Sequence, residues 1–316
     1  MKPVPIGVIG VGALGRHHAR HLALAPEADL VGVHDTDAVR GQAVAAEVGT
    51  AYFADRDELI SRVEAVSVAV PTPEHAAVGL HALERGRAVL LEKPLAATLD
   101  EADRLIALAR TRGVPLQVGH VERFNRAIRA ARPYLAEVRY FESTRLAPFQ
   151  PRGTDVEVIL DLMIHDLDLV LHLGRGAAVR EVHGSGVAVL TPRIDIANAR
   201  VEFEGGGVAN ITASRVARDR VRRLRLFQPN GYFSLDLAAG NGVFMRLRDD
   251  RPEHASSLTE VVETIQLEAP EADALGLELR SFVRSVRGEA EAVVTGVEGR
   301  AALALALRVS AAVAGG

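Results

Sequence analysis

One lysine in the middle of the chain has the chemistry of an active-site residue. Although the sequence contains 37 basic residues, only Lys2 and Lys93 are lysines. Lys93 lies between Glu92 and Pro94, directly after an apolar run. An ammonium group changes its pKa and exchanges a proton, whereas a guanidinium stays charged. Lys93 is therefore a candidate for catalysis, with a simple exposed lysine at a strand end as the alternative.

A second set of polar residues lies in the apolar segment 156–174, which predicts a long helix. Spacings of three and four residues place side chains on one face of a helix. Three interpretations of this face remain open: a catalytic base, His165, oriented by Asp161; a metal site; or buried polar groups bonded to neighbouring backbone. The metal interpretation is the weakest, because two residues at i and i+4 supply fewer ligands than zinc usually needs, and no metal is predicted. The polar face consists of Asp161, His165, Asp168 and His172.

The stretch GVGALG at residues 10–15 has the spacing of a dinucleotide-binding loop. A strand precedes it, a helix follows it, and Asp35 comes about 20 residues further on. Asp35 is expected to bind the adenosine ribose and to repel a 2′-phosphate. Because Thr36 and Asp37 supply no nearby arginine, the sequence predicts NAD in preference to NADP. The predicted cofactor contacts are Gly10, Gly12, Ala13, Leu14, Gly15 and Asp35.

These residues lie among alternating strands and helices in the first 120 residues. Continuous apolar strands separated by helices indicate a parallel sheet covered on both faces. Lys93 comes at the carboxyl end of such a strand, where open α/β sheets bind ligands. The predicted strands are 4–10, 28–35, 65–71, 87–94 and 114–120, and the predicted helices are 13–24, 38–49, 74–86 and 99–113.

The pattern changes after about residue 123. Helices are predicted at 123–135 and 156–174 and near 271–287 and 296–314, with strand-like runs between. GGG at 205–207 and PNG at 229–231 predict hairpin turns. The predicted fold is α/β: a doubly wound Rossmann domain at 1–122, followed by an α+β domain at 123–316 with a largely antiparallel open sheet. This second domain is expected to bind substrate and mediate oligomerisation, with the final helix packing across the junction.

Composition restricts the possible partners. The chain has 316 residues and a net charge of −4, which argues against a nucleic-acid-binding protein. It has no cysteine, which excludes disulfides, a thiolate nucleophile and cysteine-ligated metal. No apolar stretch is long enough to span a membrane. The apolar start is followed at once by Arg16, His17 and His18, so we interpret it as a strand in a cytoplasmic protein.

Four motifs together resemble the Gfo/Idh/MocA family of NAD(P)-dependent sugar oxidoreductases. They are GVGALG, the acid at 35, VPTPEH at 70–75 and EKP at 92–94. The family also carries an aspartate followed four residues later by a histidine, as Asp161 and His165 are here. The resemblance spans nearly the whole chain, and the combination of EKP with this D-x-x-x-H pair is its most specific part.

The resemblance implies a mechanism. His165 would take the proton of a sugar hydroxyl while the carbon gives hydride to the nicotinamide, and Lys93 would stabilise the oxygen. Which of the two is the base remains open. His75 could instead belong to a helix start, and Arg123 and Asn125 could instead be hydrogen-bonding residues at the domain junction. The further cofactor contacts that the resemblance implies are Pro71, Thr72, His75, Glu92, Lys93, Arg123 and Asn125.

Three features resemble a branch that acts on nucleotide sugars: GHVERFN at 119–125, the stretch 147–169 and the short chain. The expected reaction is oxidation of the 3-hydroxyl of a UDP-N-acetylhexosamine or a derived uronate. RGTD at 152–155 replaces the glycine-rich run common in the family. The basic run at 215–226 is compatible with a diphosphate contact or with a subunit interface. The expected substrate-side residues are Lys93, Arg145, Arg152, Asp161 and His165.

Two other functions remain open on this scaffold. One is a redox-inactive NAD-binding regulator, which would not need Lys93, Asp161 and His165. The other is a glycosidase of the same family, which uses tightly held NAD without net formation of NADH. In each case a homodimer or homotetramer through the C-terminal sheet is expected.

Overall fold

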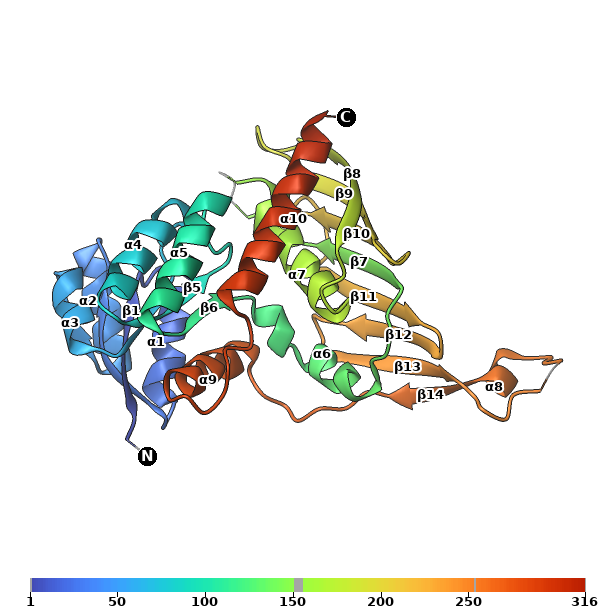
Figure 1. The fold of residues 1–316 in the computed structure, drawn as a ribbon, viewed down its shortest axis with the longest axis horizontal. Helices are drawn as coiled ribbons and strands as arrows, with labels where there is room; N and C mark the ends of the chain where they lie inside the picture. Colours follow the sequence, from blue (N-terminus) through green and yellow to red (C-terminus); the bar gives the residue numbers. More distant parts are fainter. Residues whose placement is uncertain (1, 151–155, 253, 316) are drawn as a thin grey trace. The chain divides into compact units, whose positions relative to one another are not determined.

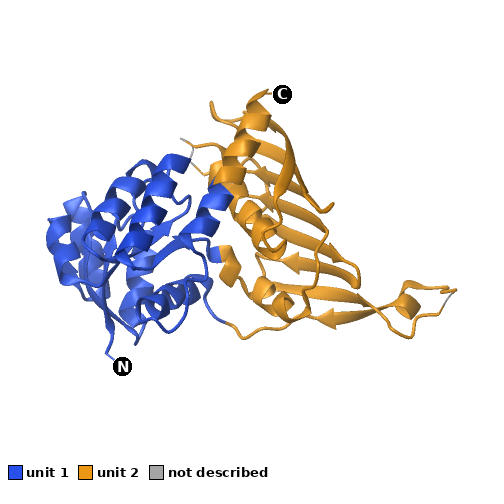
Figure 2. Cartoon of the chain, in the orientation of Figure 1, with its two compact units in different colours: residues 1–121, 272–303 blue, residues 122–271, 304–316 orange. Residues whose placement is uncertain are grey.

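The computed structural model describes residues 2–150, 156–252 and 254–315, and the chain divides into two compact units (Figure 2). The first unit contains residues 1–121 and 272–303, and the second contains 122–271 and 304–316. Residues 272–303, which the sequence-based boundary assigned to the second domain, therefore belong to the first unit. Among the described residues, no helix is long and apolar enough to cross a membrane.

The first unit contains a six-stranded parallel sheet with the order β3-β2-β1-β4-β5-β6 (Figure 1). This is the order of a doubly wound dinucleotide-binding sheet, so the predicted Rossmann fold is confirmed. The strands are β1 (Val4–Ile9), β2 (Ala28–His34), β3 (Ala51–Tyr52), β4 (Ala65–Val68), β5 (Ala88–Glu92) and β6 (Leu116–Gly119). The helices are α1 (Gly15–Leu24), α2 (Ala38–Val48), α3 (Arg56–Arg62), α4 (Thr72–Glu84), α5 (Leu99–Arg112) and α9 (Ala274–Val286).

Helices cover both faces of this sheet because its strands are apolar on both sides. Neighbouring residues of a strand point to opposite faces. Leu90 belongs to the core cluster that also contains Leu22 of α1 and Phe282 of α9. Leu91 lies on the other face, where a Cβ added to Gly79 of α4 would be 3.0 Å from it. The burial of successive strand residues thus explains the continuous apolar runs in the sequence.

The second unit contains an eight-stranded sheet with the order β14-β13-β12-β11-β7-β10-β9-β8. All neighbouring strands are antiparallel except β7 and β10, so the predicted largely antiparallel sheet is confirmed. The strands are β7 (Tyr140–Leu146), β8 (Val179–Val187), β9 (Ile196–Phe203), β10 (Val208–Ser214), β11 (Val221–Gln228), β12 (Gly231–Asp236), β13 (Asn241–Leu247) and β14 (Val262–Gln266). The helices are α6 (Arg126–Ala131), a π-helix (Ile159–Met163), α7 (Ile164–Leu173) and α8 (Leu258–Val261), while α10 (Gly296–Gly315) begins in the first unit.

One face of this sheet is packed under helices, and the other carries polar and aromatic side chains. α7 packs on β7 and β10, and α6 packs on β12 and β13 (Figure 1). Under these helices the strands bury large side chains, and Phe233 stacks on Phe244 with ring centroids 4.3 Å apart. The predicted GGG hairpin turn joins β9 to β10, with Gly205 and Gly206 at positive φ. Glycine tolerates this backbone region without a steric cost.

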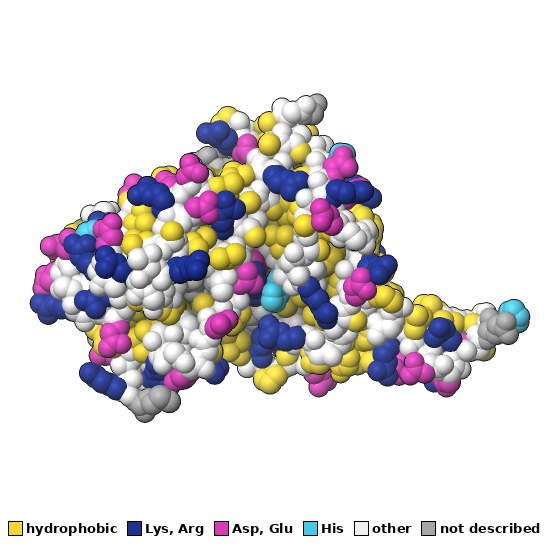
Figure 3. Space-filling view, in the orientation of Figure 1, with side chains coloured by type: hydrophobic (Ala, Val, Ile, Leu, Met, Phe, Trp, Pro, Cys, Tyr) yellow, Lys and Arg dark blue, Asp and Glu magenta, His cyan; other side chains and the backbone are white. Residues whose placement is uncertain are grey.

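Charged side chains of both signs are interspersed on the face shown in Figure 3. Arg300 pairs with Asp103 in the first unit, and Arg246 pairs with Glu263 in the second. Exposed pairs of this kind contribute little to stability.

Candidate functional site

The glycine loop has the geometry that a dinucleotide requires. Gly10 follows β1 with φ +82°, and a Cβ on Gly15 would lie 1.8 Å from the carbonyl oxygen of Gly10. A Cβ on Gly12, in contrast, would meet no atom within 4 Å. Gly10 and Gly15 are therefore needed for the turn itself, while Gly12 leaves open space. Ala13 and Leu14 complete the turn before α1 begins at Gly15. A pyrophosphate fits such a loop at a helix N-terminus.

Asp35 lies directly after β2, where the ribose was expected. Its carboxylate accepts hydrogen bonds from the backbone N–H groups of Val11 and Asp37, each at 2.9 Å. Burial raises the pKa of Asp35, but hydrogen bonds from Arg40, Asp37 and Val11 outweigh it and hold the pKa below its usual value. The buried carboxylate is therefore charged and held next to the glycine loop.

The expectation that no arginine lies near Asp35 is wrong. Arg40 donates from Nε to Oδ2 at 3.0 Å and from Nη2 to Oδ1 at 2.7 Å. The cause is local, because Asp37 caps the start of α2 and the first helical turn brings Arg40 back over the strand end. Arg40 partly neutralises the carboxylate, so the predicted repulsion of a 2′-phosphate by Asp35 is weaker than the sequence indicated.

A cavity of about 580 Å³ adjoins the glycine loop and Asp35. It lies beside the ends of β1 and β4, where the strand order of the sheet reverses, and this is the usual ligand position in such folds. Pro71, a predicted cofactor contact, lines it, and Thr72 follows at the start of α4. Arg56 also lines the cavity and was not predicted, because it comes from a helix that the sequence pattern did not indicate. The apolar walls and the single buried carboxylate suit a bound dinucleotide.

The EKP segment continues from β5. Glu92 is the last residue of the strand and is 7 % exposed, while Lys93 is half-buried. One oxygen of Glu92 lies 3.1 Å from Nε2 of His18, and the other accepts a hydrogen bond from the backbone N–H of Lys93 at 3.1 Å. Glu92 is thus bonded within the unit, and its connection to the predicted site is through the backbone of Lys93.

His75 is buried, and each of its ring nitrogens lies beside a backbone carbonyl oxygen. Its Nδ1 lies 2.8 Å from the carbonyl oxygen of Pro94, and its Nε2 lies 2.9 Å from that of Val70. Burial lowers the pKa of His75, although the two carbonyls oppose this shift. These contacts support a structural role in place of the expected contact with the cofactor. His75 connects the end of β4 to the segment after Lys93.

Asp161 and His165 lie where the predicted long helix changes its geometry. Asp161 belongs to the π-helix Ile159–Met163, and His165 lies in the first turn of α7. Both side chains are half-buried, next to the fully buried Met163 and Ile164. Single π-turns inside helices occur frequently at functional sites, because they change the direction of the side chains.

The other two residues of the predicted polar face, Asp168 and His172, contact Arg123 within the second unit. Arg123 donates to both oxygens of Asp168, at 2.8 and 2.6 Å, and its Nη1 lies 3.2 Å from Nδ1 of His172. Arg123 and Asp168 are almost completely buried. Arg123 was expected to contact the cofactor, and this buried ion pair supports a structural role instead. The same pair explains why Asp168 and His172 occur in an apolar helix.

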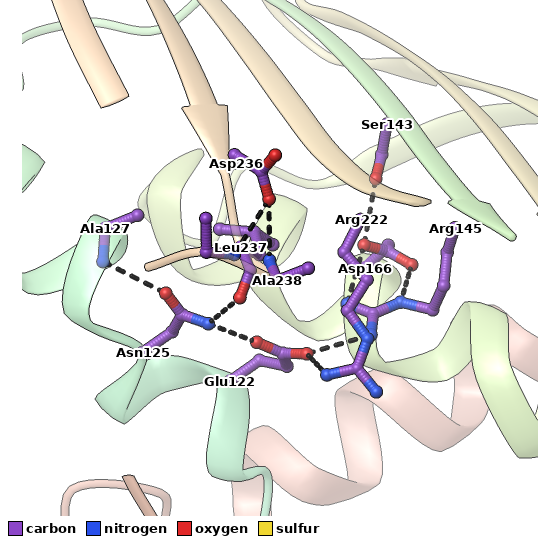
Figure 4. Close-up of polar contacts among 11 residues, drawn as sticks. Glu122, Asn125, Ala127, Ser143, Arg145, Asp166, Arg222, Asp236, Leu237 and Ala238 are labelled. Carbon is purple, nitrogen blue, oxygen red and sulfur yellow. Dashed lines mark hydrogen bonds and ion pairs between the residues drawn. The ribbon is translucent and has the colours of Figure 1, made fainter. Parts of the chain in front are cut away.

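A second buried network holds Arg145, as Figure 4 shows. Arg145 donates to both oxygens of Asp166, at 2.6 and 3.1 Å, and to Glu122 at 2.8 Å. Burial lowers its pKa, but the charges of Asp166 and Glu122 raise the pKa above the usual value. Ser143 donates to Asp166 at 2.8 Å. Because Arg145 is 3 % exposed and paired with two carboxylates, the structure argues against the expected contact with substrate.

Asn125 also forms its hydrogen bonds within the second unit. Its side chain accepts from the N–H of Ala127 at 3.0 Å and so caps α6, and it donates to Glu122 and to the carbonyl of Leu237 (Figure 4). These bonds join the segment after β6 to the turn after β12. They support a hydrogen-bonding role within the second unit, in place of a contact with the cofactor.

The basic run at 215–226 divides into parts with different surroundings. Arg215 is buried and donates to the carbonyl of Val156. Arg222 is partly exposed beside Glu122 at 3.3 Å (Figure 4), whereas Arg225 lies on the opposite face of β11, over the rings of Phe227 and Tyr232. Arg218 and Arg220 are exposed before the strand. Arg152, the remaining predicted substrate contact, lies outside the described residues.

Of the predicted cofactor residues in the first unit, Gly10, Gly12, Asp35 and Pro71 line one cavity. Lys93 belongs to the first unit, and Asp161 and His165 belong to the second. The convergence of these three side chains on one pocket therefore remains a prediction. Within the described parts of the chain, no group of three or more histidines and acids is placed to hold a metal ion.

Comparison with known proteins identifies the family. The model described as "Oxidoreductase family, NAD-binding Rossmann fold" matches residues 4–120, and the GFO/IDH/MocA C-terminal domain model matches residues 127–234. The chain therefore belongs to the GFO/IDH/MocA family of NAD-binding oxidoreductases. It is a dehydrogenase of this family with NAD as cofactor, and the predicted family, enzyme class and cofactor are confirmed.

Individual relatives agree with this assignment. The UDP-N-acetylglucosamine 3-dehydrogenase of Acidithiobacillus ferrooxidans is 40 % identical over 309 residues, covering 97 % of this chain and 96 % of that protein. Its solved structure superposes with a TM-score of 0.92, at 39 % identity over 99 % of this chain and 98 % of that chain. The scyllo-inositol 2-dehydrogenase (NAD(+)) of Bacillus subtilis is 29 % identical over 233 residues, 68 % of each protein. GenD2 from gentamicin A biosynthesis, solved with NAD, shares the fold with a TM-score of 0.83 and 22 % identity, over 99 % of this chain and 95 % of that chain.

Proposed function

We propose that this protein oxidises the 3-hydroxyl of UDP-N-acetylglucosamine with NAD. The observation that carries the proposal is the 40 % identity to a UDP-N-acetylglucosamine 3-dehydrogenase along almost the full length of both chains. The inositol dehydrogenase, which acts on a free polyol, is less similar and matches a smaller part of the chain. A UDP-N-acetylhexosamine is therefore the preferred substrate class.

Lys93 and His165 divide the chemistry in this proposal. His165, oriented by Asp161, takes the proton of the 3-hydroxyl, because a neutral imidazole is a suitable base near pH 7. Lys93 binds the same oxygen through its ammonium and stabilises the negative charge that develops there. NAD, when bound, accepts the hydride from the carbon that carries this oxygen. Loss of proton and hydride together converts the alcohol to a ketone.

The proposed cofactor contacts are of two kinds: backbone contacts from the glycine loop and a side-chain contact from Asp35. The loop from Gly10 to Gly15 approaches the pyrophosphate, and Asp35 accepts hydrogen bonds from the adenosine ribose. Pro71 and Thr72 lie at the nicotinamide side in this assignment. For the UDP diphosphate, we favour the exposed arginines Arg218 and Arg220, together with Arg222 and Arg152, because arginine suits phosphate oxygens. Arg145 is not included, because its guanidinium is bonded to Asp166 and Glu122.

We further propose that the enzyme acts in the cytoplasm as a homodimer or homotetramer. Nucleotide sugars and NAD are cytoplasmic metabolites, which supports this location for the proposed reaction. The exposed face of β11, with Arg225 over two aromatic rings, is suited to a partner subunit because interfaces are enriched in arginine and aromatic residues. Light scattering on the purified protein measures the oligomeric state directly.

A substrate panel tests the reaction. NADH formation is measured with UDP-N-acetylglucosamine, UDP-N-acetylgalactosamine, UDP-glucose, free N-acetylglucosamine and myo-inositol. We expect the highest kcat/KM with UDP-N-acetylglucosamine. Reduction of the product with borodeuteride should place deuterium at carbon 3 of the sugar, as read by mass spectrometry. Oxidation of inositol but of no UDP-sugar, or deuterium at another carbon, would refute the proposed substrate.

A further inference from the structure

A buried polar cluster lies directly behind the EKP segment, entirely within the first unit. It joins three elements: His18 from α1, Ser67 from β4 and Glu92 from β5. Nδ1 of His18 lies 2.7 Å from Oγ of Ser67, and Nε2 lies 3.1 Å from Oε1 of Glu92. His18 and Ser67 are completely buried, and Glu92 is 7 % exposed. The proposed reaction uses none of these three side chains directly.

Glu92 is held as a carboxylate at this position. Burial raises its pKa, but the ion pair with His18 and the charge of the nearby Lys93 lower the pKa below its usual value. The neighbouring strand accommodates this carboxylate because its paired residue, Gly119, has no side chain: a Cβ there would lie 2.7 Å from Oε1. The remaining oxygen accepts the backbone N–H of Lys93 at 3.1 Å. The position of Glu92 therefore fixes the peptide group at the start of Lys93.

A second histidine fixes the other side of Lys93. Nδ1 of His75 lies 2.8 Å from the carbonyl oxygen of Pro94, and Nε2 lies 2.9 Å from that of Val70. A neutral imidazole carries one N–H, and the tautomer with the proton on Nδ1 donates it to Pro94. In that tautomer the backbone on both sides of Lys93 is bonded to a buried side chain. The ionisable groups around this segment that influence one another are His18, His75, Glu92 and Lys93.

Stability alone does not account for this cluster. A buried ion pair contributes little compared with well-packed apolar residues of the same size, because both groups lose their hydration. Apolar side chains at these positions would fill the same space. They would not, however, accept the N–H of Lys93 or donate to the carbonyl of Pro94. The cluster is therefore better explained by its effect on the backbone geometry of the EKP segment around Lys93.

We propose that His18, acting through Glu92, and His75, acting through the carbonyl of Pro94, are positioning residues that hold Lys93 in its reactive geometry. The inference rests on the proposed function only in that Lys93 is the group that binds the reacting oxygen. Errors of about 1 Å in the position of such a group lower turnover by up to roughly 100-fold.

Two substitutions of His18 separate positioning from packing. Asparagine places an amide near the position of Nδ1 and can keep the bond to Ser67, but it does not reach Glu92. Glutamine places its amide near Nε2 and can still donate to Glu92. We expect His18→Asn to lower kcat by about 10-fold or more with little change in the KM for NAD, and His18→Gln to recover most of kcat. His17→Asn, at the exposed neighbouring histidine, is the matched control.

The scarcity of lysine supplies a readout that needs no sugar. Reductive methylation with ¹³C-formaldehyde labels only Lys2, Lys93 and the N-terminal amine. Lys93→Arg identifies the Lys93 resonance, and Lys2 is the internal standard. We expect the chemical shift and titration midpoint of Lys93 to change in His18→Asn and to return toward wild type in His18→Gln. If His18→Asn does not fold, Glu92→Leu tests the bond to Lys93, because leucine has no acceptor oxygen.

The two readouts distinguish this inference from the proposed function. An unchanged Lys93 resonance in His18→Asn overturns the positioning role, even if kcat falls. A changed resonance together with full turnover on the active sugar also overturns it, because the displacement would then have no catalytic effect. Failure of the UDP-sugar panel alone affects the proposed substrate and leaves the Lys93 measurement valid.

Discussion

The two units bury their charged groups in different ways. In the first unit, the buried His18–Glu92 pair leads to the backbone of Lys93, a residue of the proposed site. In the second unit, Arg145 pairs directly with Asp166 at the centre of a network that joins α7 to the sheet. The first arrangement sets the position of a reactive group, whereas the second holds structural elements together. Substitutions in the two networks should therefore affect different measurements.

The largest expected effect is on the stability of the second unit. Arg145→Met leaves Asp166 and Glu122 buried without their shared partner. Removing one member of a buried ion pair usually costs about 3–5 kcal/mol. We expect a loss of this size in the free energy of unfolding, measured with chemical denaturant. Arg300→Met, which breaks the exposed pair with Asp103, is the control and should cost less than about 1 kcal/mol. Equal losses in the two variants would remove the distinction between buried and exposed pairs.

Substitution of Lys93 should affect turnover and leave the fold intact. We expect Lys93→Met to lower kcat by about 100-fold or more, because the ammonium that stabilises the developing charge is lost. Lys93→Arg tests whether charge alone is sufficient, and we expect a similar loss because a guanidinium has a different shape. NAD binding, measured by calorimetry, should remain within about twofold of wild type. Turnover close to wild type in Lys93→Met would exclude Lys93 from the mechanism.

His165 tests whether α7 carries a reactive group as well as structural ones. We expect His165→Ala to lower kcat by about 100-fold and to remove an ionisation near neutral pH from the pH–rate profile. His172→Ala, on the same helix, loses its contact with Arg123 and should affect stability more than kcat. If both variants lost turnover equally and the pH profile kept its shape, the base would have to be assigned elsewhere.

The fold could be predicted because its signals are local. Apolar runs and helical spacing located five of the parallel strands to within a few residues, and the glycines of 205–207 indicated their hairpin. β3 and α3 were missed because a two-residue strand and a seven-residue helix are too short to show a period. The π-helix at Ile159–Met163 was read as part of one long α-helix. The apolar pattern of the two helix types is too similar over five residues to separate them.

The site could be predicted only where its residues are close in sequence. GVGALG and EKP are contiguous, so their backbone roles could be inferred. The sequence did not indicate the buried surroundings of Arg123 and Arg145, because their partners Asp168 and Asp166 are more than 20 residues away. Sequence spacing does not indicate which arginine a distant carboxylate will neutralise. Arg40 was overlooked for a simpler reason, since a helix start can return a residue five positions later to the strand end.

Arg40 also tests whether the first unit uses a side-chain ion pair to control its ligand. In Arg40→Ala the charge of Asp35 is no longer balanced, so repulsion of a 2′-phosphate should increase. We expect the ratio of kcat/KM for NAD to that for NADP to rise by roughly 10-fold. Arg62→Ala, which removes an exposed arginine paired with Glu58, is the control. A ratio that falls instead would mean that Arg40 contacts the ribose or adenine of NAD more than it neutralises Asp35.

Asp195 sets a limit to this contrast between the two units. It lies in the second unit, yet its buried carboxylate bonds to backbone, accepting the N–H groups of Val189, Leu190 and Thr191 at 2.7–2.9 Å. Burial raises its pKa, but these bonds and the Thr191 hydroxyl lower the pKa to about 2. Its stabilising contribution is therefore present above the unfolded pKa, near 3.8, and is lost as the pH falls toward 2.

The difference in free energy of unfolding between wild type and Asp195→Asn should therefore be constant from neutral pH to about pH 4 and shrink below it. Urea denaturation at several pH values measures this difference, and Asp219→Asn, at an exposed position, controls for the change in charge. A difference that does not depend on pH would mean that the amide replaces the carboxylate as an acceptor. The ordering of residues 189–191 would then depend on an acceptor oxygen and not on a negative charge. In this respect Asp195 would differ from the charged carboxylates of Asp35 and Glu92.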